Sequence, residues 1–543
     1  MIHGQTGGLK SSQIKALERL YQRRCSPQQL LSSDLAHSLC GLSRELNCQL
    51  GLIIDRGGAV RHVIVGDDRQ ILIPDLSGFA TGRSGLRGLR CIHTHLRDEP
   101  LSDDDLTDLA LLRLDLMVAI GVAADGAPAG CHYAHLLPPN PQGRQVEQQQ
   151  VRHFFQLQLD LRAFLQALED ELERTLQQSI DLSDPRERAI LLSVGKGSLK
   201  ALEDSLSELR ELARSADVLV LDQVIQRPQR LNPRFLMGEG KLKEVVIRAL
   251  QQRATLLIFD QDLSPNQVRS ITALTDLKVL DRSQLILDIF ARRAHTLDGK
   301  VQVELAQLKY ILPRLTGKGT AFSRLMGGIG GRGPGETKLE IDRRRIRERI
   351  ARLEQRLQQL ARQRLQRRQK RQRADLPIVS IVGYTNAGKS TLLNALTRSA
   401  VRAEDLLFAT LDTATRRLRF PSERELIVTD TVGFIRQLPE GLMGAFRATL
   451  EEMEDADLLL HVVDLANPCF EEQILAVEHI LAELDLARIP RLLVFNKIDL
   501  VAPVEVAACC RRYGAVPVSA CEPDSFAPLL QQLQQRFWPT AAS

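Results

Sequence analysis

Residues 383–390 have the types and spacing of a phosphate-binding loop. They read Gly-Tyr-Thr-Asn-Ala-Gly-Lys-Ser and fit the pattern G-x-x-x-x-G-K-[S/T], whose glycines let the backbone wrap around phosphates. The loop lies between the apolar run 376–382 and a helix-forming run from Thr391, and N–H groups at a helix N-terminus point toward a bound anion. Lys389 would reach the β- and γ-phosphates, and the Ser390 hydroxyl would bind Mg²⁺. We expect phosphate contacts from the whole loop: Gly383, Tyr384, Thr385, Asn386, Ala387, Gly388, Lys389 and Ser390.

Three later segments narrow the nucleotide to GTP, and each follows an apolar strand-like run. The first segment, residues 430–433, would hold the Mg²⁺ shell through Asp430 and sense the γ-phosphate through the amide of Gly433. The second ends in Asp499, whose carboxylate can accept both hydrogens that guanine offers at N1 and N2, a donor pair that adenine lacks. The third would offer backbone N–H groups to the guanine carbonyl oxygen. The three segments are Asp430, Thr431, Val432 and Gly433; Asn496, Lys497, Ile498 and Asp499; and Ser519 with Ala520.

Between the phosphate loop and the Asp430 segment lies a plausible switch segment: Phe408, Ala409, Thr410, Leu411 and Asp412. Thr410 would bind Mg²⁺ only when the γ-phosphate is present. We therefore expect Lys389, Thr410 and Gly433 to be catalytic, with Ser390 and Thr410 as metal ligands. Any one of these motifs alone is weak, but five in the right order, at the ends of apolar strands, predict a GTP-binding α/β domain over residues 376–543.

Phe434 follows Gly433, where many GTPases have a glutamine that orients the attacking water. A phenylalanine cannot do this, so we expect slow intrinsic hydrolysis that depends on another device or a partner. The alternative is that backbone groups position the water and Phe434 only packs.

Composition limits the other possibilities. The chain has 543 residues, enough for three or four domains, and its nine scattered cysteines suit a reducing cytosol rather than a disulfide framework. The polar N-terminus is no signal peptide, and no apolar run approaches the roughly 18–20 residues that span a bilayer. We expect a cytoplasmic monomer.

Positive charge is concentrated in one segment. Residues 338–373 hold 15 Lys/Arg against 4 Asp/Glu, a net of +11, so the rest of a chain with net charge +5 is about −6. Heptad-spaced apolar residues in this segment and over 301–315 predict two helices in an antiparallel hairpin with outward-facing arginines. The glycine-rich, cationic loop 316–337 would join them. A solvated linker is the alternative, but the basic hairpin favours contact with RNA.

The segment 327–340, Gly-Gly-Ile-Gly-Gly-Arg-Gly-Pro-Gly-Glu-Thr-Lys-Leu-Glu, closely resembles the linker of HflX proteins, GTPases of the Obg–HflX group. Residues 237–242, 259–265 and 301–308 also resemble the HflX N-terminal region, and the likeness covers about residues 190–540. It implies a factor that binds the large ribosomal subunit and its rRNA and splits stalled or idle ribosomes in the GTP state. It also implies ribosome-stimulated GTP hydrolysis with Mg²⁺, and it raises the hypothesis that Asn386 helps bind a stimulating K⁺. A GTPase of large-subunit assembly, or an RNA-binding adaptor in which GTP is structural, would share these motifs.

The predicted fold class is α/β: a P-loop GTPase domain plus α/β N-terminal domains, joined by a basic antiparallel helical hairpin. The predicted domains are an extension of unknown role (1–187), an HflX-type α/β domain (188–282), the hairpin (283–375) and the GTPase domain (376–543). One amphipathic helix remains after Ala520, so we expect no separate C-terminal domain. Within the extension we predict strands at 49–54 and 60–65 and a long helix near 146–178.

Cys91, His93 and His95 alternate as on one face of a strand, with Ser102 and Asp105 downstream. This set loosely resembles the zinc motif of JAMM-type metalloproteases, and a metalloprotease fused to a GTPase is a further alternative. Its spacing is one residue short of that motif, and no catalytic glutamate is clearly placed upstream. We therefore favour a decayed or merely fold-related domain over an active zinc site.

Overall fold

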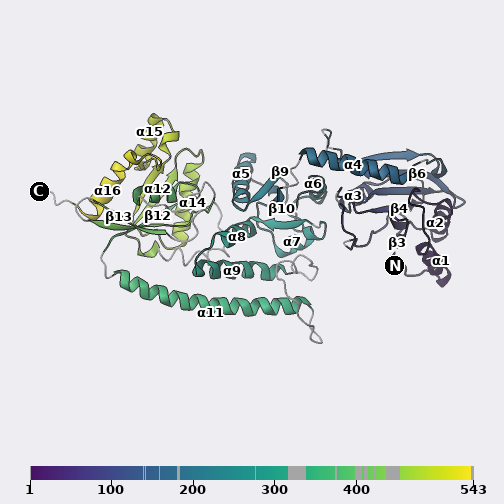
Figure 1. Ribbon diagram of the computed structural model, residues 1–543, viewed down its shortest axis with the longest axis horizontal. Coiled ribbons are helices and arrows are strands. Elements are labelled where there is room, and N and C mark those ends of the chain that lie inside the picture. Colours follow the sequence, from purple (N-terminus) through teal and green to yellow (C-terminus); the bar gives the residue numbers. More distant parts are fainter. Residues whose placement is uncertain are drawn as a thin grey trace. The chain divides into compact units, whose positions relative to one another are not determined.

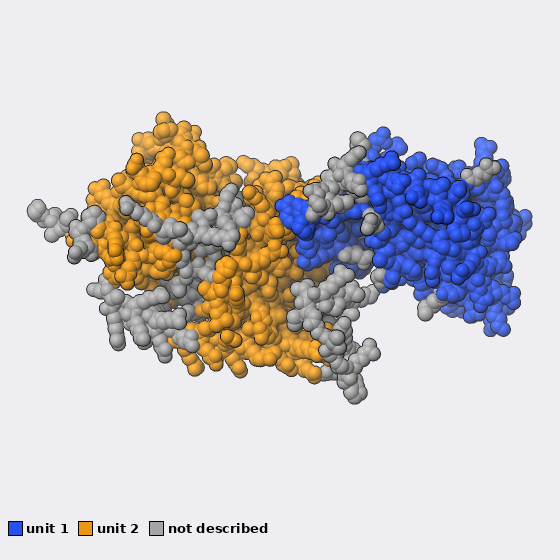
Figure 2. Space-filling view, viewed as in Figure 1, with its two compact units in different colours: residues 1–190, 230–257, 271–278 blue, residues 191–229, 258–270, 279–543 orange. Residues whose placement is uncertain are grey.

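The computed structural model describes the chain except for residues 1, 77, 83, 139, 141, 143, 158, 180–183, 276, 316–337, 373–375, 398–406, 409–413, 421–423, 436–452 and 540–543 (Figure 1). The fold is α/β, as predicted. The chain divides into two compact units, coloured in Figure 2: residues 1–190, 230–257 and 271–278 form the first, and residues 191–229, 258–270 and 279–543 form the second. No helix in the described parts of the chain is long and apolar enough to cross a bilayer.

A seven-stranded sheet, in the order β1-β3-β2-β4-β5-β6-β7, forms the N-terminal region. Its strands are β1 (Ile2–Gly4), β2 (Leu50–Asp55), β3 (Val60–Val65), β4 (Leu89–His95), β5 (Leu116–Val122), β6 (Pro128–Leu136) and β7 (Val146–Val151). Its helices are α1 (Ser11–Tyr21), α2 (Ser33–Leu46), α3 (Asp103–Leu111), the 3-10 helix η1 (Phe154–Gln156) and α4 (Leu161–Ser179). β2 and β3 confirm the strands predicted at 49–54 and 60–65.

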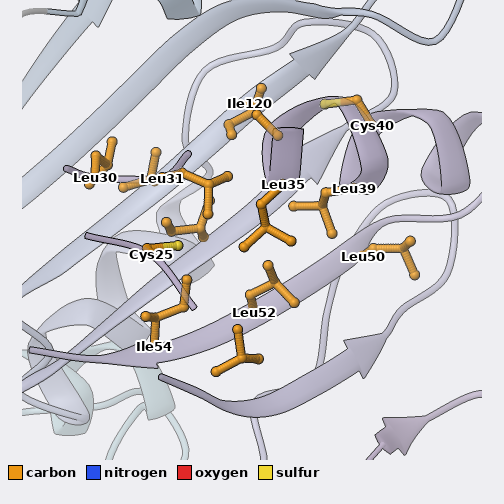
Figure 3. Close-up of a cluster of buried hydrophobic side chains, with 14 of the residues drawn as sticks. Cys25, Leu30, Leu31, Leu35, Leu39, Cys40, Leu50, Leu52, Ile54 and Ile120 are labelled. Carbon is orange, nitrogen blue, oxygen red and sulfur yellow. The ribbon is translucent and has the colours of Figure 1, made fainter. Parts of the chain in front are cut away.

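The core of this region forms because strand and helix periodicities match. Alternate residues of β2 point to the same face, where they meet apolar residues of α2 (Figure 3). The other face of β2 carries Ile53, which packs in a separate core with Cys91 of β4 and Leu109 of α3. The sheet is therefore buried on both sides. The labelled side chains on α2 and β2 are Leu35, Leu39, Cys40, Leu50, Leu52 and Ile54.

The helix predicted near 146–178 is wrong in its first part. Residues Val146–Val151 form strand β7, which pairs antiparallel with β6, and the helix α4 begins only at Leu161. Glu and Gln favour helix in isolation, but pairing with β6 satisfies the backbone and outweighs that local preference.

A four-stranded sheet, in the order β11-β10-β8-β9, follows. Its elements are β8 (Glu187–Val194), α5 (Leu199–Ser215), β9 (Val218–Gln226), α6 (Glu239–Gln251), β10 (Leu256–Phe259), α7 (Pro265–Thr272), β11 (Lys278–Asp281) and α8 (Arg282–Arg293). The sequence over residues 188–281 alternates apolar runs with helix-forming runs, which predicts strands at 189–194, 218–221, 256–259 and 278–280 and helices at 199–213, 239–252 and 264–275. The structure confirms these four strands and three helices. The sequence Gly-Glu-Gly-Lys at 238–241 could suggest a second phosphate loop, but a helix start is the favoured prediction, and Gly238 is indeed the N-cap of α6.

Two helices pack side by side (Figure 1): α9 (Leu297–Ile311), extended by the 3-10 turn η2 (Leu312–Arg314), and the basic helix α11 (Lys338–Gln372). Ile346 and Leu353, two of the predicted heptad residues on α11, are buried. Ion pairs of 2.7 Å join Arg349 to Glu304 and Lys309 to Glu354 across the helices. The glycine-rich loop 316–337 lies outside the described residues.

The last sheet has six strands in the order β13-β14-β12-β15-β16-β17. The strands are β12 (Ile378–Gly383), β13 (Ala414–Arg419), β14 (Glu425–Asp430), β15 (Leu458–Asp464), β16 (Arg491–Asn496) and β17 (Val516–Pro517). All neighbouring pairs are parallel except β13–β14 at the edge. The helices are α12 (Lys389–Thr397), α14 (Phe470–Glu483), α15 (Pro503–Tyr513) and α16 (Ala527–Phe537), with 3-10 turns η3 (Met453–Asp455), η4 (Ile498–Leu500) and η5 (Pro523–Phe526).

Candidate nucleotide-binding active site

Parallel pairing brings the predicted motifs to one edge of the six-stranded sheet. β12 lies between β14 and β15, so the strand order reverses there, and ligands of open α/β sheets bind at the carboxyl ends of strands beside such a reversal. The phosphate loop follows β12, residues 430–433 follow β14, and the Asn496 segment follows β16. The sheet therefore gathers segments that are far apart in sequence.

Two positions in the phosphate loop require a left-handed backbone: Gly388, with φ of +87°, and Asn386, with φ of +62°. Glycine is needed at the first because a Cβ on Gly388 would overlap the side-chain nitrogen of Asn496. Asn386, an asparagine, tolerates this conformation and is exposed at the loop. The loop backbone is therefore held in the curved shape that a phosphate cradle needs.

The side chain of Asn496 joins two loops by hydrogen bonds. Its side-chain NH₂ donates to the carbonyl oxygen of Ala387 at 2.8 Å, and its side-chain oxygen accepts from the N–H of Ala520 at 2.9 Å. The residue is buried, so this role is positional: it fixes the phosphate loop against the segment after β17.

Lys389 is buried at the start of α12, and its Nζ donates to the carbonyl oxygen of Tyr384 at 2.6 Å. Burial lowers the pKa of Lys389 to about 8, against the attraction of the Asp430 carboxylate. A Cβ on Gly433 would lie 2.8 Å from this Nζ, so the two predicted catalytic residues adjoin. Phosphate oxygens placed here would supply the negative charge that a buried ammonium lacks.

A hydroxyl and a carboxylate meet beside the lysine. Ser390 Oγ donates to Asp430 Oδ2 at 2.6 Å, and Thr431 Oγ1 donates to the carbonyl oxygen of Ile381 at 2.6 Å. Oxygen donors of this kind suit Mg²⁺, so Ser390 and Asp430 fit the expected metal. Thr410, the second predicted metal ligand, lies outside the described residues.

In the two segments predicted to contact guanine, residues 496–499 and 519–520, the structure shows which polar groups are already paired. Asp499 is exposed, and Lys497, at φ of +61°, pairs through Nζ with Asp464 at 2.7 Å. The N–H of Ser519 donates to Ser525 Oγ at 2.9 Å, and that of Ala520 donates to Asn496. A contact between either N–H group and the guanine oxygen therefore stays a prediction.

Phe434 is buried beneath the phosphate loop. Its N–H donates to the Gly383 carbonyl oxygen at 3.1 Å, and its own carbonyl oxygen accepts from the N–H of Thr385 at 2.8 Å. This short parallel bridge ties the segment after Asp430 to the phosphate loop. The apolar ring offers no group that could orient a water molecule.

The start of the predicted switch segment is anchored on α5 and α8. Leu407 N–H donates to Ser215 Oγ at 2.9 Å, and the rings of Phe408 and Phe290 meet edge-on at 4.7 Å. Ala409, Thr410, Leu411 and Asp412 lie outside the described residues. Sequence reasoning missed Ser215 and Phe290, because no local motif marks residues that contact the site only in three dimensions.

A buried charge network also reaches the phosphate loop. The hydroxyl of Tyr384 donates to Glu208 at 2.7 Å, and Arg282 pairs with Glu208 at 3.0 Å and with Asp260 at 2.8 Å. Although burial opposes it, these two carboxylates raise the pKa of Arg282. The arginine is thus held charged, and it links α5 and β10 to the residue after Gly383.

Family models match most of the chain after residue 200. They are described as GTP-binding GTPase N-terminal (residues 203–291), GTP-binding GTPase Middle Region (293–371) and 50S ribosome-binding GTPase (378–497). Curated relatives include the GTPase HflX of Caldanaerobacter subterraneus subsp. tengcongensis, 50% identical over 59% of this chain and 74% of that protein. The GTPase HflX of Escherichia coli K12 is 47% identical over 60% of this chain and 76% of that protein.

Among solved structures, this chain is similar to a GTP-binding protein from the archaeon Sulfolobus solfataricus in complex with GDP. The identity is 25%, over 64% of this chain and 99% of that chain, with a TM-score of 0.37.

Proposed function

The chain belongs to the HflX family of GTPases and hydrolyses GTP, and from that premise we propose that it is a ribosome-associated factor that binds the large subunit. We further propose that its GTP-bound state splits stalled or idle ribosomes into subunits. A role in large-subunit assembly is the alternative. Support comes from the matched family, described as 50S ribosome-binding, and from the charge on α11.

In the proposed site the chain's own residues position the nucleotide. The phosphate-loop N–H groups and Lys389 hold the phosphates, Gly433 adjoins the γ-phosphate, and Asp499 selects guanine. Bound Mg²⁺, held by Ser390 and Asp430, would neutralise charge on the phosphate oxygens. Because Phe434 cannot orient water, the site favours a low intrinsic rate that a partner raises.

The proposed binding to the ribosome rests mainly on a set of exposed arginines on α11. Arg345, Arg347, Arg352, Arg356 and Arg362 are exposed, and none has an ion-pair partner among the residues that the structure describes. A solvated helix usually balances such charge with acidic neighbours at i+3 or i+4. Unbalanced arginines instead suit the phosphates of RNA, which they can bind in bidentate fashion.

The test is sedimentation of purified 70S ribosomes with the full chain and a non-hydrolysable GTP analogue. Separation into subunits with the analogue, but not with GDP, would support the splitting activity. The variant Lys389→Ala should bind nucleotide poorly and fail to split ribosomes, whereas Lys278→Ala, a surface substitution, should behave as wild type. Binding to free large subunits without splitting would favour the assembly role, and unchanged function of Lys389→Ala would favour an adaptor.

We also propose that K⁺ stimulates hydrolysis at Asn386, whose position on the exposed part of the loop suits a cation contact. Hydrolysis rates in matched K⁺ and Na⁺ buffers test this directly. Equal rates, or an unchanged K⁺ effect in Asn386→Ala, would remove the proposal.

A further inference from the structure

Three metal-ligating side chains converge in the N-terminal sheet, away from the nucleotide site. His93 and His95 are alternate residues of β4, so both rings lie on the same face of the strand. Asp105, in the first turn of α3, completes the cluster. The two Nε2 atoms are 2.9 Å apart, His93 Nε2 is 3.3 Å from Asp105 Oδ1, and His95 Nε2 is 3.7 Å from Asp105 Oδ2.

Neighbouring groups orient two of the three donors, His95 and Asp105, whereas His93 Nδ1 is buried without a hydrogen-bond partner among the described residues. Glu99 contributes a carbonyl oxygen, 2.8 Å from His95 Nδ1, and since a carbonyl only accepts, Nδ1 carries the proton and Nε2 presents its lone pair. The backbone N–H and hydroxyl of Ser102 both donate to Asp105 Oδ2, at 2.8 and 2.7 Å.

The cross-strand neighbours of the two histidines are small. β4 lies between β2 and β5, and its two histidines are paired with Ala119 and Gly121 of β5, while Gly51 of β2 is the other neighbour of His93. His93 and His95 are almost fully buried, whereas Asp105 reaches solvent.

We propose that His93, His95 and Asp105 bind one divalent cation of the zinc class, with the fourth coordination position taken by water or a ligand. Tetrahedral Zn²⁺ with bonds of about 2.0–2.1 Å separates its ligand atoms by about 3.3 Å. The two Nε2 atoms at 2.9 Å and His93 Nε2 with Asp105 Oδ1 at 3.3 Å are close to this separation, and one ligand atom from each residue lies within 4.8 Å of the others. Two imidazoles and a carboxylate suit Zn²⁺ rather than Mg²⁺ or Ca²⁺, which prefer oxygen donors throughout. Three protein ligands with one open position is the pattern of a catalytic rather than a structural zinc site.

The test is equilibrium dialysis of the full chain against Zn²⁺, with bound metal counted per chain by mass spectrometry. His93→Gln and Asp105→Asn each remove one ligand, and Asp105→Asn keeps an oxygen that can accept from Ser102. His132→Gln removes a buried histidine of the same sheet outside the cluster and is the matched control. We expect wild type and His132→Gln to bind one equivalent more than the ligand variants, whose affinity should fall by at least about 100-fold.

Two readouts separate this result from trivial causes. Bound Co²⁺ should show the visible absorption of a tetrahedral site in wild type and lose it in both ligand variants. The far-ultraviolet circular dichroism spectrum and its urea transitions should be unchanged in both variants, which shows that loss of metal is not loss of the folded N-terminal sheet. The proposal is overturned if wild type binds no more Zn²⁺ than Asp105→Asn, since the nine cysteines could bind zinc in every variant and the cluster would then be a hydrogen-bonded histidine pair.

Discussion

At the scale of single residues, we expect base selection to depend on Asp499. We predict that Asp499→Asn lowers GTP affinity by at least about 100-fold, because the amide NH₂ then faces the donors of guanine and leaves them unpaired. Xanthosine triphosphate carries an oxygen where guanine has N2, so the variant should gain affinity for it. Competition binding against both nucleotides measures this.

The matched control for Asp499→Asn is Asp524→Asn, which changes an exposed carboxylate in the 3-10 turn η5. It should leave both affinities unchanged. If Asp499→Asn kept the full preference for GTP, the guanine-reading role of this carboxylate would be wrong.

His461 makes the GTPase domain sensitive to acid. It is buried on β15, and burial, with Arg491 and Lys389 nearby, lowers its folded pKa from 6.5 to about 3. Between these values only the unfolded chain binds the proton, so stability is lost as pH falls below 6.5, by about 1.4 kcal/mol per pH unit. We expect the free energy of unfolding of wild type to fall by about 2 kcal/mol more than that of His461→Gln between about pH 7 and pH 5.

The chain offers a probe for that measurement. Its single tryptophan, Trp538, packs against Phe420 in the GTPase domain, so tryptophan fluorescence during urea unfolding reports on this domain. If the free energy of unfolding fell equally with pH in wild type and in His461→Gln, a group other than His461 would cause the loss of stability in acid.

At the scale of elements, α11 should carry the affinity for RNA. We predict that reversing three of its exposed arginines (Arg345→Glu, Arg352→Glu and Arg356→Glu) weakens binding to large subunits and flattens its salt dependence by roughly 0.7–0.9 in log–log slope per lost phosphate contact. Filter binding over a series of salt concentrations measures both quantities.

Charge reversal on α11 should leave GTP hydrolysis without ribosomes unchanged, because none of these arginines belongs to the nucleotide site. Arg69→Glu, an exposed arginine of the N-terminal region, is the control and should keep wild-type binding. An unchanged salt slope in the triple variant would contradict RNA contact by this helix.

At the scale of the whole molecule, the seven-stranded N-terminal sheet and the six-stranded sheet of the GTPase domain should unfold separately, since each has its own buried core. Trp538 lies in the second unit, whereas far-ultraviolet circular dichroism reports on both. We predict that the two urea transitions do not coincide, because separate cores need not unfold together. A single coincident transition would contradict this.

Bound nucleotide should stabilise only the unit that contains the GTPase domain. GDP with Mg²⁺ at about 100 times its dissociation constant stabilises the folded site by about 2.7 kcal/mol. The fluorescence transition should therefore move to higher urea, and the part of the dichroism change that belongs to the first unit should stay in place.

The sequence by itself was enough to predict the residues expected to do the chemistry and to determine most of the elements beneath them. The phosphate loop, Asp430, Asn496 and Asp499 could be recognised because their chemistry requires particular residue types at fixed local spacing. The strands over 188–281 followed from apolar runs broken by turns, which is also local information. The helix wrongly predicted over residues 146–160 shows the limit of local information. Its Glu-Gln-Gln-Gln sequence forms strand β7, because β6 supplies an edge with which it pairs.

Only the tertiary structure decided what those residues touch. Asn496 is a clasp between Ala387 and Ala520, and Tyr384 meets Glu208, because the parallel sheet and the packing of α5 bring together positions more than 100 residues apart. The same holds for His93, His95 and Asp105, whose sequence spacing argued against a metal site while the turn into α3 brings the carboxylate to both imidazoles. Sequence spacing counts residues along the chain, whereas coordination depends on distances that the fold sets.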